Sequence, residues 1–218
     1  MNFRVGIQGA TGRTGTQIVE LLRPGYIVGG DRLDFESVAP IDVWIDFSRP
    51  QATIDLMKKI NEPIVIGTTG FDEAQLATIR LYAETHPVLL SANMSPGMNA
   101  VFGALRNLNL KPQAVESVVL RDWHHKHKKD SPGGTAKTLM AILEEQGHQV
   151  RVEVTRSGEM PGAHEVQFIS DDEEVVMSHR VWNRRVFAKG ALCAAHWLVK
   201  QRRSGMYTME DVLKGSQS

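Results

Sequence analysis

The sequence holds one cysteine, no surplus of charge of either sign and no long apolar run. One cysteine excludes an intramolecular disulfide, and 25 basic residues against 25 acidic ones give no overall attraction to nucleic acid or to an anionic membrane. No apolar stretch approaches the ~20 residues that a membrane-spanning helix needs, and the strand-like start lacks the pattern of a secretory signal. We therefore expect a cytoplasmic protein without nucleic-acid or membrane partners.

Length and composition are those of a folded protein. The chain has 218 residues, of which 42% are hydrophobic and 23% charged, as in a globular protein with one large domain or two small ones. Cys193 lies in the apolar run 190–195, so we expect it to be a small core residue.

The first half of the chain alternates short apolar segments with amphipathic ones. Strands are expected at 3–8, 26–29, 43–47, 64–67 and 88–91, and helices at 14–22, 50–61 and 72–85. Repeated strand–helix units of this kind predict a parallel sheet with right-handed crossovers.

The pattern changes after Asn93. Helices are expected at 98–108, 135–145, 187–202 and 208–214, and strands at 116–123, 149–155, 165–169 and 174–178. Runs of strands after a helix, without regular alternation, indicate a second domain of the α+β class. Its sheet is expected to be mostly antiparallel or mixed.

A glycine-rich turn separates the first expected strand from the first expected helix. Gly9, Gly12 and Gly15 form a Gly-x-x-Gly-x-x-Gly pattern. A dinucleotide site needs glycine here because the chain turns sharply, the backbone approaches the pyrophosphate and the helix packs closely on the strand. The phosphates then meet N–H groups at the helix N-terminus. This context favours dinucleotide binding over a plain strand-to-helix turn.

Three further segments are candidates for cofactor contacts. Asp31 stands about 20 positions after the glycine turn, where a carboxylate binds the adenosine ribose, and Arg32 beside it suits a 2′-phosphate. We therefore expect NADH and/or NADPH, with two solvated surface charges as the alternative. The loops 67–70 and 91–97 follow expected strands, at the sheet edge where ligands bind, although each alone is also typical of an ordinary turn.

Residues 122–135 form the least ordinary stretch, with three histidines and three lysines within 124–129. Four interpretations compete: a nucleic-acid patch, a metal site, a solvated basic loop and a site for an anionic substrate. The chain lacks a basic surplus, and the lysines would oppose a cation where no carboxylate has an evident ligating spacing. The turn 132–135 precedes an expected helix and can bind a carboxylate, while histidine and lysine can donate protons. These features favour the anionic substrate, and we expect no metal.

This stretch resembles the signature of the dihydrodipicolinate reductase family, Glu-x-His-His-x-x-Lys-x-Asp-Ala-Pro-Ser-Gly-Thr-Ala. Residues 122–136 read Asp-Trp-His-His-Lys-His-Lys-Lys-Asp-Ser-Pro-Gly-Gly-Thr-Ala. Further segments similar to the family follow in order along the chain, at 9–15, 46–48, 67–70, 93–99, 156–164, 184–191 and 205–213. Their number and order argue against chance agreement.

The resemblance implies an architecture and a reaction. The fold would be α/β, with a Rossmann-like parallel-sheet cofactor domain formed by 1–94 and 184–218. An α+β domain with a mixed sheet, residues 95–183, would bind substrate and build a homotetramer. The implied reaction is the NAD(P)H-dependent reduction of 4-hydroxy-tetrahydrodipicolinate, a small cyclic dicarboxylate, to tetrahydrodipicolinate in diaminopimelate and lysine biosynthesis. Hydride would pass to the ring carbon that carried the hydroxyl, with loss of water.

The resemblance also implies roles for single residues. His124 matches the proton donor or acceptor and Lys128 the proton donor, and the substrate contacts are His125, Gly134 and Thr135. The implied cofactor contacts are Gly9, Ala10, Thr11, Gly12, Arg13, Thr14, Asp31, Arg32, Gly67, Thr68, Thr69, Ser91, Ala92, Asn93 and Met94.

The chain departs from the family pattern at several positions. Asp122 stands for glutamate, Trp123 for a smaller residue, Gly133 for serine and Met94 for a common phenylalanine. None of these changes removes a proposed acid or carboxylate ligand, although Trp123 alters the shape of the substrate pocket. Three other functions remain open: a different Rossmann-type reductase, a non-catalytic NADP-binding sensor and an inactive paralogue.

Overall fold

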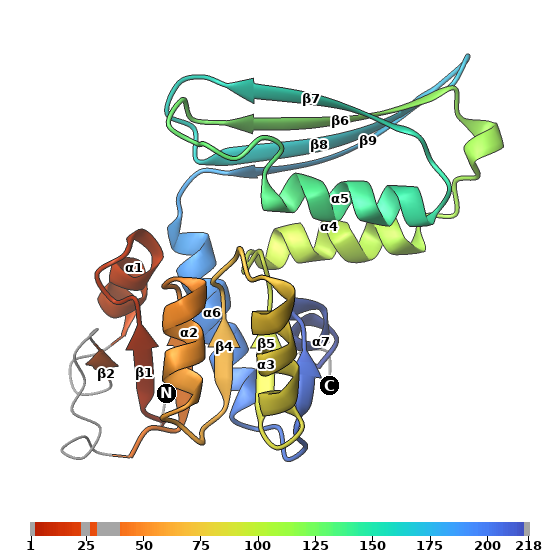
Figure 1. The fold of residues 1–218 in the computed structure, drawn as a ribbon. Coiled ribbons are helices and arrows are strands. Elements are labelled where there is room, and N and C mark those ends of the chain that lie inside the picture. The colour runs from red at the N-terminus through yellow and green to blue at the C-terminus, as the bar shows by residue number, and fades with distance from the viewer. Residues whose placement is uncertain (1–2, 23–26, 30–39, 216–218) are drawn as a thin grey trace. The chain divides into compact units, whose positions relative to one another are not determined.

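A computed structural model describes residues 3–22, 27–29 and 40–215. The chain divides into two compact units (Figure 1). Unit 1 comprises Met1–Pro96 and Arg185–Ser218, and unit 2 comprises Gly97–Arg184. Both boundaries lie within two residues of those expected from the sequence.

Unit 1 is built on a parallel sheet, here called sheet A. Its strands are short and hydrophobic, and those of its centre are buried along their whole length, as expected for a sheet covered on both faces. In spatial order they are β10 (Gly205–Tyr207), β5 (Pro87–Leu90), β4 (Ile64–Ile66), β3 (Val43–Asp46), β1 (Val5–Gln8) and β2 (Ile27–Gly29), and every neighbouring pair is parallel.

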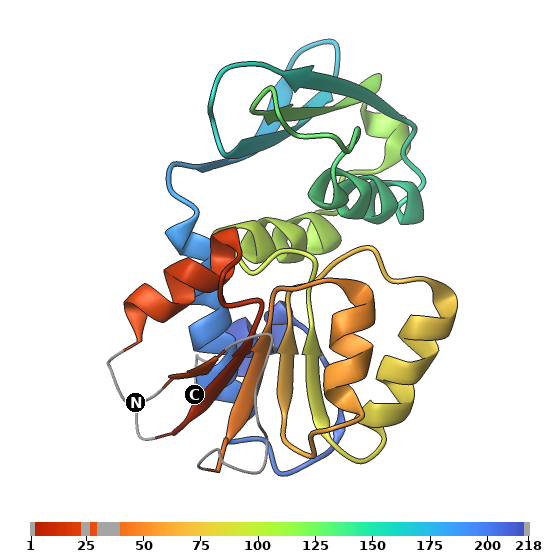
Figure 2. The same cartoon turned by 60° about the vertical axis from the view of Figure 1, so that its left-hand side comes forward.

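Helices cover both faces of sheet A (Figures 1 and 2). On one face lie α1 (Arg13–Leu21), α6 (Arg185–Leu198) and α7 (Met209–Gly215), and on the other α2 (Pro50–Met57) and α3 (Glu73–Ala83). The strands alternate between two cores: Ile45 packs with α6, whereas Trp44 packs with α2 and α3. The predicted parallel α/β domain is thus confirmed.

Small residues let α6 pack closely against sheet A and the backbone at Met94. A side chain at Gly190 would place its Cβ 1.7 Å from the carbonyl oxygen of Met94, so only glycine fits there. The alanines 188, 191, 194 and 195 are buried against the sheet. Cys193, on the same helix, is exposed, so the expectation of a core cysteine is wrong. Periodicity explains the error, because Cys193 falls between the buried positions 192 and 194 on the outward side of the helix.

Unit 2 packs helices on one face of a mixed sheet, here called sheet B. Its strand order is β7 (Val150–Arg156), β6 (Ser117–His124), β8 (Gly162–Ile169) and β9 (Glu174–Val181). The pair β6–β7 is parallel, and the pairs β6–β8 and β8–β9 are antiparallel. The helices α4 (Pro96–Asn107) and α5 (Gly134–Glu145) bury their apolar sides on this sheet, and a 3-10 turn, η1 (Pro112–Ala114), precedes β6. The predicted mixed α+β domain is confirmed.

Alternation along β6 assigns its residues to two faces. Leu120 and Asp122 are buried on the helix-covered face, whereas Arg121 lies on the other face and forms ion pairs with Glu153 and Glu165 on the flanking strands. Register then sets the neighbours of Asp122, because His164 of β8 lies directly opposite it. In the parallel register, Arg156 of β7 lies opposite His124. Backbone pairing therefore gathers four polar side chains at one end of sheet B.

The sequence analysis expected no membrane-spanning helix. Among residues 3–22, 27–29 and 40–215, no helix is both long enough and apolar enough to cross a bilayer.

Candidate functional site

The loops predicted to contact a dinucleotide leave sheet A at one edge. The segment 9–14 follows β1, 67–69 follows β4 and 91–94 follows β5. All three strands are parallel, so their carboxyl ends share that edge, which is where open α/β sheets bind ligands. Asp31 and Arg32 lie outside the described residues.

The glycine turn after β1 is shaped by close backbone contacts. Gly9 has φ of 81°, which favours glycine, and a side chain there would lie 2.4 Å from the carbonyl oxygen of Phe47. A Cβ at Gly15 would lie 2.0 Å from the carbonyl oxygen of Gly9. The helix that follows, α1, begins at Arg13, and its N-cap residue Gly12 leaves the first turn without a side-chain cap. The turn thus supplies backbone N–H groups at a helix N-terminus, and these residues fit a pyrophosphate.

A buried carboxylate ties the loop after β4 to the segment that follows β3. Asp46, at the end of β3, is fully buried and accepts hydrogen bonds from Ser48, Thr53 and Thr68. Burial raises the pKa of Asp46, and these hydrogen bonds oppose that rise. The Thr68 hydroxyl donates to Asp46 at 2.8 Å and accepts from the Ser48 N–H at 2.9 Å. Thr68 therefore shapes the loop with its side chain, and only its backbone is left to meet a ligand.

The loop after β5 holds its own shape through short-range hydrogen bonds. The Ser91 hydroxyl donates to the carbonyl oxygen of Asn93, and the Asn93 side chain accepts from the N–H of Ser95. Met94 is buried in the core of unit 1, while Ala92 is exposed. Of the four residues predicted here as cofactor contacts, Met94 has a packing role and the three before it lie nearer the surface.

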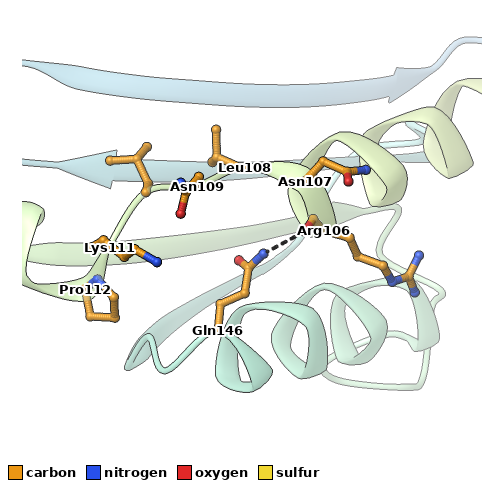
Figure 3. Close-up of a pocket in the computed structure, with 8 residues that line it drawn as sticks. Arg106, Asn107, Leu108, Asn109, Lys111, Pro112 and Gln146 are labelled. Atoms are coloured by element: carbon orange, nitrogen blue, oxygen red, sulfur yellow. Dashed lines mark hydrogen bonds between the residues drawn. The ribbon is translucent and has the colours of Figure 1, made fainter.

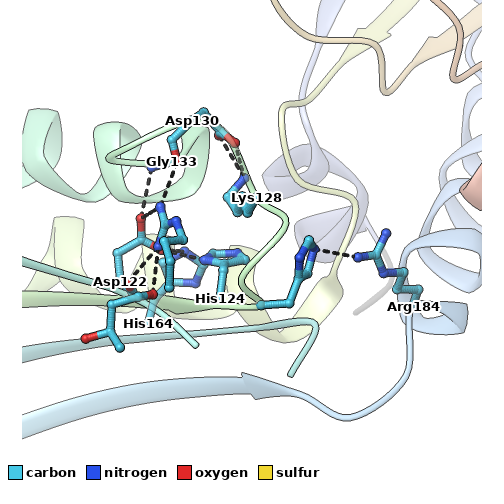
Figure 4. A network of polar contacts seen from close by, with 10 residues as sticks. Asp122, His124, Lys128, Asp130, Gly133, His164 and Arg184 are labelled. Atoms are coloured by element: carbon cyan, nitrogen blue, oxygen red, sulfur yellow. Dashed lines mark hydrogen bonds and ion pairs between the residues drawn. The ribbon is translucent and has the colours of Figure 1, made fainter. Parts of the chain in front are cut away.

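The second cluster lies in unit 2 around Asp122 (Figure 4). This carboxylate is fully buried, at 0% exposure. Its Oδ1 lies 2.7 Å from Nδ1 of His124 and 3.4 Å from Nε2 of His164. Its Oδ2 accepts from the N–H of Gly133 and from Nη2 of Arg156, both at 2.9 Å. One carboxylate thus joins β6, β7, β8 and the start of α5.

The charges in this network set the state of each group. Burial would raise the pKa of Asp122, but hydrogen bonds from His124, His164, Gly133 and Arg156 outweigh it and hold that pKa far below its usual range. Burial lowers the pKa of His124, and the positive charge of Lys128 adds to the effect, whereas Asp122 opposes it. At neutral pH, Asp122 is therefore a carboxylate and His124 a neutral imidazole. Because an ionised carboxylate only accepts, the His124 proton lies on Nδ1 and the lone pair on Nε2.

Glycine leaves room around the reactive edge of His124. A Cβ at Gly162 would lie 2.6 Å from Nε2 of His124. The His124 side chain is 12% exposed, so the imidazole is mostly enclosed while Nε2 lies along a residue without a side chain. This role of Gly162 is not visible from the sequence alone.

Lys128 and the start of α5 lie beside this histidine. The Lys128 ammonium donates to both oxygens of Asp130 at 2.7 Å, and its side chain is 21% exposed. Gly133 caps α5 without a side chain, and Gly134 opens the first turn with no atom within 4 Å of where its Cβ would be. A cation, the His124 imidazole and a helix N-terminus thus adjoin one loop, which suits a small anion.

His125 points to a different partner from His124. It is buried, and its Nε2 lies 2.9 Å from Nη2 of Arg184 (Figure 4). The sequence analysis matched the segment 184–191 to the family without giving Arg184 a role. Its guanidinium adds a second cation at the predicted substrate contact.

Sequence reasoning assigned no role to Arg156 or His164, although both lie in a matched segment. The expected strand began at 165, whereas β8 begins at Gly162, so His164 was left outside the alternating pattern that buries it. Asp122, His124 and His164 offer ligand atoms within 4.8 Å of one another. This carboxylate was overlooked in the metal argument because Asp122 and His164 are 42 positions apart. However, Arg156 already neutralises Asp122, and Lys128 lies near His124, which disfavours a cation.

A shallow hollow of about 400 Å³ lies elsewhere in unit 2 (Figure 3). It is lined by residues 106–112 and Gln146, at the carboxyl-terminal ends of α4 and α5. The Gln146 side chain donates to the carbonyl oxygens of Leu105 and Arg106. The hollow therefore lies at the opposite end of α5 from the Asp122 network, and it contains none of the predicted site residues.

Comparison with known proteins gives two family matches. Residues 23–94 match the model described as "Dihydrodipicolinate reductase, N-terminus" and residues 97–213 the one described as "Dihydrodipicolinate reductase, C-terminus". Proteins named 4-hydroxy-tetrahydrodipicolinate reductase are similar over nearly their full length. The one from Bdellovibrio bacteriovorus is 36% identical over 98% of this chain and 97% of its own, and the one from Wolinella succinogenes is 35% identical over 96% and 98%.

A solved structure supports the same fold. It is the dipicolinate-bound dihydrodipicolinate reductase from Paenisporosarcina sp. TG-14, with a TM-score of 0.75 and 19% identity, covering 95% of this chain and 98% of that one. The resemblance inferred from the histidine–lysine motif is confirmed. The chain belongs to the dihydrodipicolinate reductase family.

Proposed function

We propose that this protein is a 4-hydroxy-tetrahydrodipicolinate reductase of the diaminopimelate and lysine pathway, using NADH and/or NADPH. The observation that carries the proposal is His124, with its Nδ1 2.7 Å from the Asp122 carboxylate and its pKa lowered by burial, beside Lys128 and the α5 N-terminus. An acid–base pair next to an anion-binding turn suits the reduction of a dicarboxylate. Relatives at up to 36% identity that carry this name support the same reaction.

The cofactor would be held by the loops at the edge of sheet A. The residues proposed for this are Gly9, Ala10, Thr11, Gly12, Arg13, Thr14, Gly67, Thr68, Thr69, Ser91, Ala92, Asn93 and Met94, together with Asp31 and Arg32. When bound, the nicotinamide supplies the hydride. The chain supplies the uncapped N-terminus of α1 to the pyrophosphate, and the closeness of Gly9 to Phe47 keeps that turn narrow.

The substrate is a dianion, and unit 2 offers matching groups. The first turn of α5 presents Gly134 and Thr135 to one carboxylate, with the positive end of the helix dipole behind them. His125 and Arg184 offer cationic and N–H donors for further contacts. This division uses separate groups for binding and for proton transfer.

Proton transfer is assigned to Lys128 and His124. Substrate, NAD(P)H and one proton give tetrahydrodipicolinate, NAD(P)⁺ and water, so one proton must be delivered as hydride adds. Lys128 donates it, because neutral His124 has no proton on Nε2 to give. His124 accepts or passes on a proton at Nε2, while Asp122 holds the opposite ring nitrogen.

Cofactor preference would be decided at Asp31 and Arg32. A carboxylate favours the ribose hydroxyls of NADH, and a guanidinium favours the 2′-phosphate of NADPH. Dissociation constants of both cofactors should be measured for wild type and Arg32→Ala. We expect weaker NADPH binding with NADH binding retained. An unchanged affinity for NADPH would remove Arg32 from the site.

We also propose a homotetramer assembled through the open face of sheet B. The face that α4 and α5 leave uncovered carries Val176, 45% exposed, next to the Arg121 ion-pair group. A sheet with an uncovered face of this kind can pack against a second copy. Light scattering should give four times the chain mass. A mass equal to that of one chain would contradict this part of the proposal.

The reaction itself is tested by oxidation of reduced nicotinamide by purified protein. The preceding synthase generates the substrate in situ, and NADH and NADPH are supplied separately. Substrate-dependent oxidation would establish the reductase. Cofactor binding without oxidation would favour a sensor or an inactive paralogue, and oxidation only with other carbonyl substrates would favour a different Rossmann-type reductase.

A further inference from the structure

We propose that Asp122 is a positioning residue that sets the tautomer of His124 with one carboxylate oxygen and anchors the anion-binding turn at Gly133 with the other. This inference rests on the proposed reductase function and extends it to a buried residue that would act through His124 and Gly133. Its basis is the division of contacts between the two oxygens of Asp122 (Figure 4).

The Oδ1 side of the carboxylate faces imidazole rings. Nδ1 of His124 lies at 2.7 Å and Nε2 of His164 at 3.4 Å, both as ion-pair contacts, and among the described residues neither Oδ1 nor Nδ1 of His124 has a hydrogen-bond partner of ordinary geometry. The Nδ1–Oδ1 contact therefore fixes where the His124 proton lies. It leaves Nε2 as the proton-accepting atom, beside Gly162.

The Oδ2 side faces two donors that cannot accept. One is the backbone N–H of Gly133 and the other is the guanidinium of Arg156, each at 2.9 Å. Arg156 also donates to the carbonyl oxygens of Asp122 and Asp130, so it links β6 to the loop between β6 and α5. Asp122 thus makes His124 and the start of α5 parts of one rigid arrangement.

These fixed donors dictate what Asp122→Asn would do. An amide has one accepting oxygen and one donating nitrogen, and Gly133 and Arg156 both require the oxygen. The NH₂ group must then face His124 and donate to Nδ1. The His124 proton would move to Nε2, which removes the accepting lone pair while the turn keeps its anchor. We expect kcat to fall roughly 10²–10⁴-fold, the range of general acid–base catalysis, with KM changed by less than about threefold.

Asp122→Ala removes both functions at once. Gly133 and Arg156 lose their acceptor, so the turn loosens and KM should rise together with the fall in kcat. Asp122→Glu restores a carboxylate in the form found in the family signature. It should recover part of kcat and keep the proton on Nδ1. A residue needed only for folding would not separate kcat from KM in this way.

A metal ion is the competing explanation of the same three side chains. Asp122, His124 and His164 could ligate a cation, in which case Oδ1 would bind metal rather than a proton donor. The 2.7 Å approach of Nδ1 and the neutralisation by Arg156 argue for the hydrogen bond. Loss of activity on chelation, restored by Zn²⁺, would overturn the proposal.

The deciding experiment reads the tautomer directly and does not need turnover. Imidazole ¹⁵N shifts of the full-length protein are recorded for wild type, Asp122→Asn, Asp122→Glu and Glu159→Gln, with His124→Gln to assign the signal. We expect Nδ1–H in wild type, Nε2–H in Asp122→Asn and Nδ1–H again in Asp122→Glu. Glu159 is an exposed carboxylate paired with Lys126, so its variant should match wild type.

The two proposals fail in different ways. If wild type shows no substrate-dependent oxidation but His124 carries Nδ1–H, the reductase function falls and the tautomer assignment stands. An Nε2–H signal in wild type, or an unchanged tautomer in a folded Asp122→Asn, would overturn the role of Asp122. Thermal unfolding of each variant identifies any that do not fold, and Asp122→Glu then carries the test.

Discussion

The glycine turn of unit 1 and the Asp122 network of unit 2 hold their atoms in place by opposite means. In the turn, the backbone is forced into shape because side chains at Gly9 and Gly15 would collide with carbonyl oxygens. In the network, a buried carboxylate collects donors from four separate elements. The glycine turn is formed mainly by residues close together in sequence. The network depends instead on which residues of neighbouring strands are paired.

The difference has a consequence for how each site fails. A backbone turn tolerates almost no added atom, but it contains no titratable group in its fixed part. The network, in contrast, is built from titratable side chains, and its function depends on where protons lie. Substitution by size should therefore break the first site, and substitution by charge the second.

Charge changes at the acid–base pair should have the largest effect. His124→Gln and Lys128→Ala should each lower turnover by roughly 10²–10⁴-fold, because each removes a proton-transfer group. Dissociation constants for NADH, measured by fluorescence titration, should stay within about twofold of wild type. Lys126→Ala, which removes an exposed lysine of the same loop, is the matched control and should be near wild type. Loss of NADH binding in either variant would indicate a folding defect instead.

Added size at the glycine turn should have the next largest effect. The Cβ of Gly15→Ala would lie 2.0 Å from a backbone oxygen that cannot move without shifting the turn. We expect NADH binding to weaken by about 100-fold and the free energy of unfolding to fall by about 3 kcal/mol. Gly103→Ala, in α4 with open space around it, should instead gain about 1 kcal/mol. Similar results for the two variants would remove the steric account of the turn.

The pH dependence tests the protonation state of His124 without any substitution. His124 has a folded pKa below its unfolded value of 6.5, so the unfolded chain binds more protons in that range. From His124, stability is constant above pH 6.5 and falls below it by at most about 1.4 kcal/mol per pH unit. The kcat/KM should fall on the acid side with a midpoint below 6.5, as Nε2 becomes protonated. A midpoint above 6.5 would exclude neutral His124 as the working form.

The depressed pKa of Asp122 acts at lower pH and in the same direction. Its stabilisation is fully present above the unfolded pKa of about 3.8 and is lost as the pH falls further. An acid titration followed by circular dichroism should therefore show wild type losing stability more steeply below pH 4 than Asp122→Asn. Parallel curves would mean that the carboxylate is not held ionised by the fold.

A small change at Gly133 should have the smallest effect. The Cβ of Gly133→Ser would lie 3.0 Å from Cε and 3.3 Å from Nζ of Lys128, which is the end of a flexible side chain. Lys128 can move aside, so kcat should change by less than about tenfold and the fold should persist. Steady-state kinetics would measure this. A loss as large as that of Lys128→Ala would show that Lys128 has no room to move.

Much of the fold could be predicted because the hydrophobic pattern changes along the chain. Alternating strand and helix signals before Asn93 gave the parallel sheet, and the motif 122–136 gave the family. The short strand β10 was missed, since Gly205–Tyr207 is only three residues long and carries no periodicity. The exposure of Cys193 was missed because a run of small apolar residues does not reveal which side of a helix faces outward.

For the candidate site, sequence reasoning singled out only residues that are adjacent in sequence. His124, His125 and Lys128 stood out by composition, but nothing local connects Asp122 with His164 or Arg156. Those contacts arise from the pairing of β6 with β8 and β7, which is a long-range property. The signal that could have found them was alternation in β8, provided that the strand was begun at Gly162.

The position of Asp122 in a paired strand also limits how this chain can change in length. Side chains alternate between the faces of sheet B, so deletion of one residue from β6 would turn Asp122 to the face of Arg121 and bring Trp123 under α5. Insertions in the loop 125–132 carry no such penalty for the strand. Variation in length within β6 should therefore break the network through the strand register, whereas variation within 125–132 would leave the register intact and act through the positions of Lys128 and Gly133 instead.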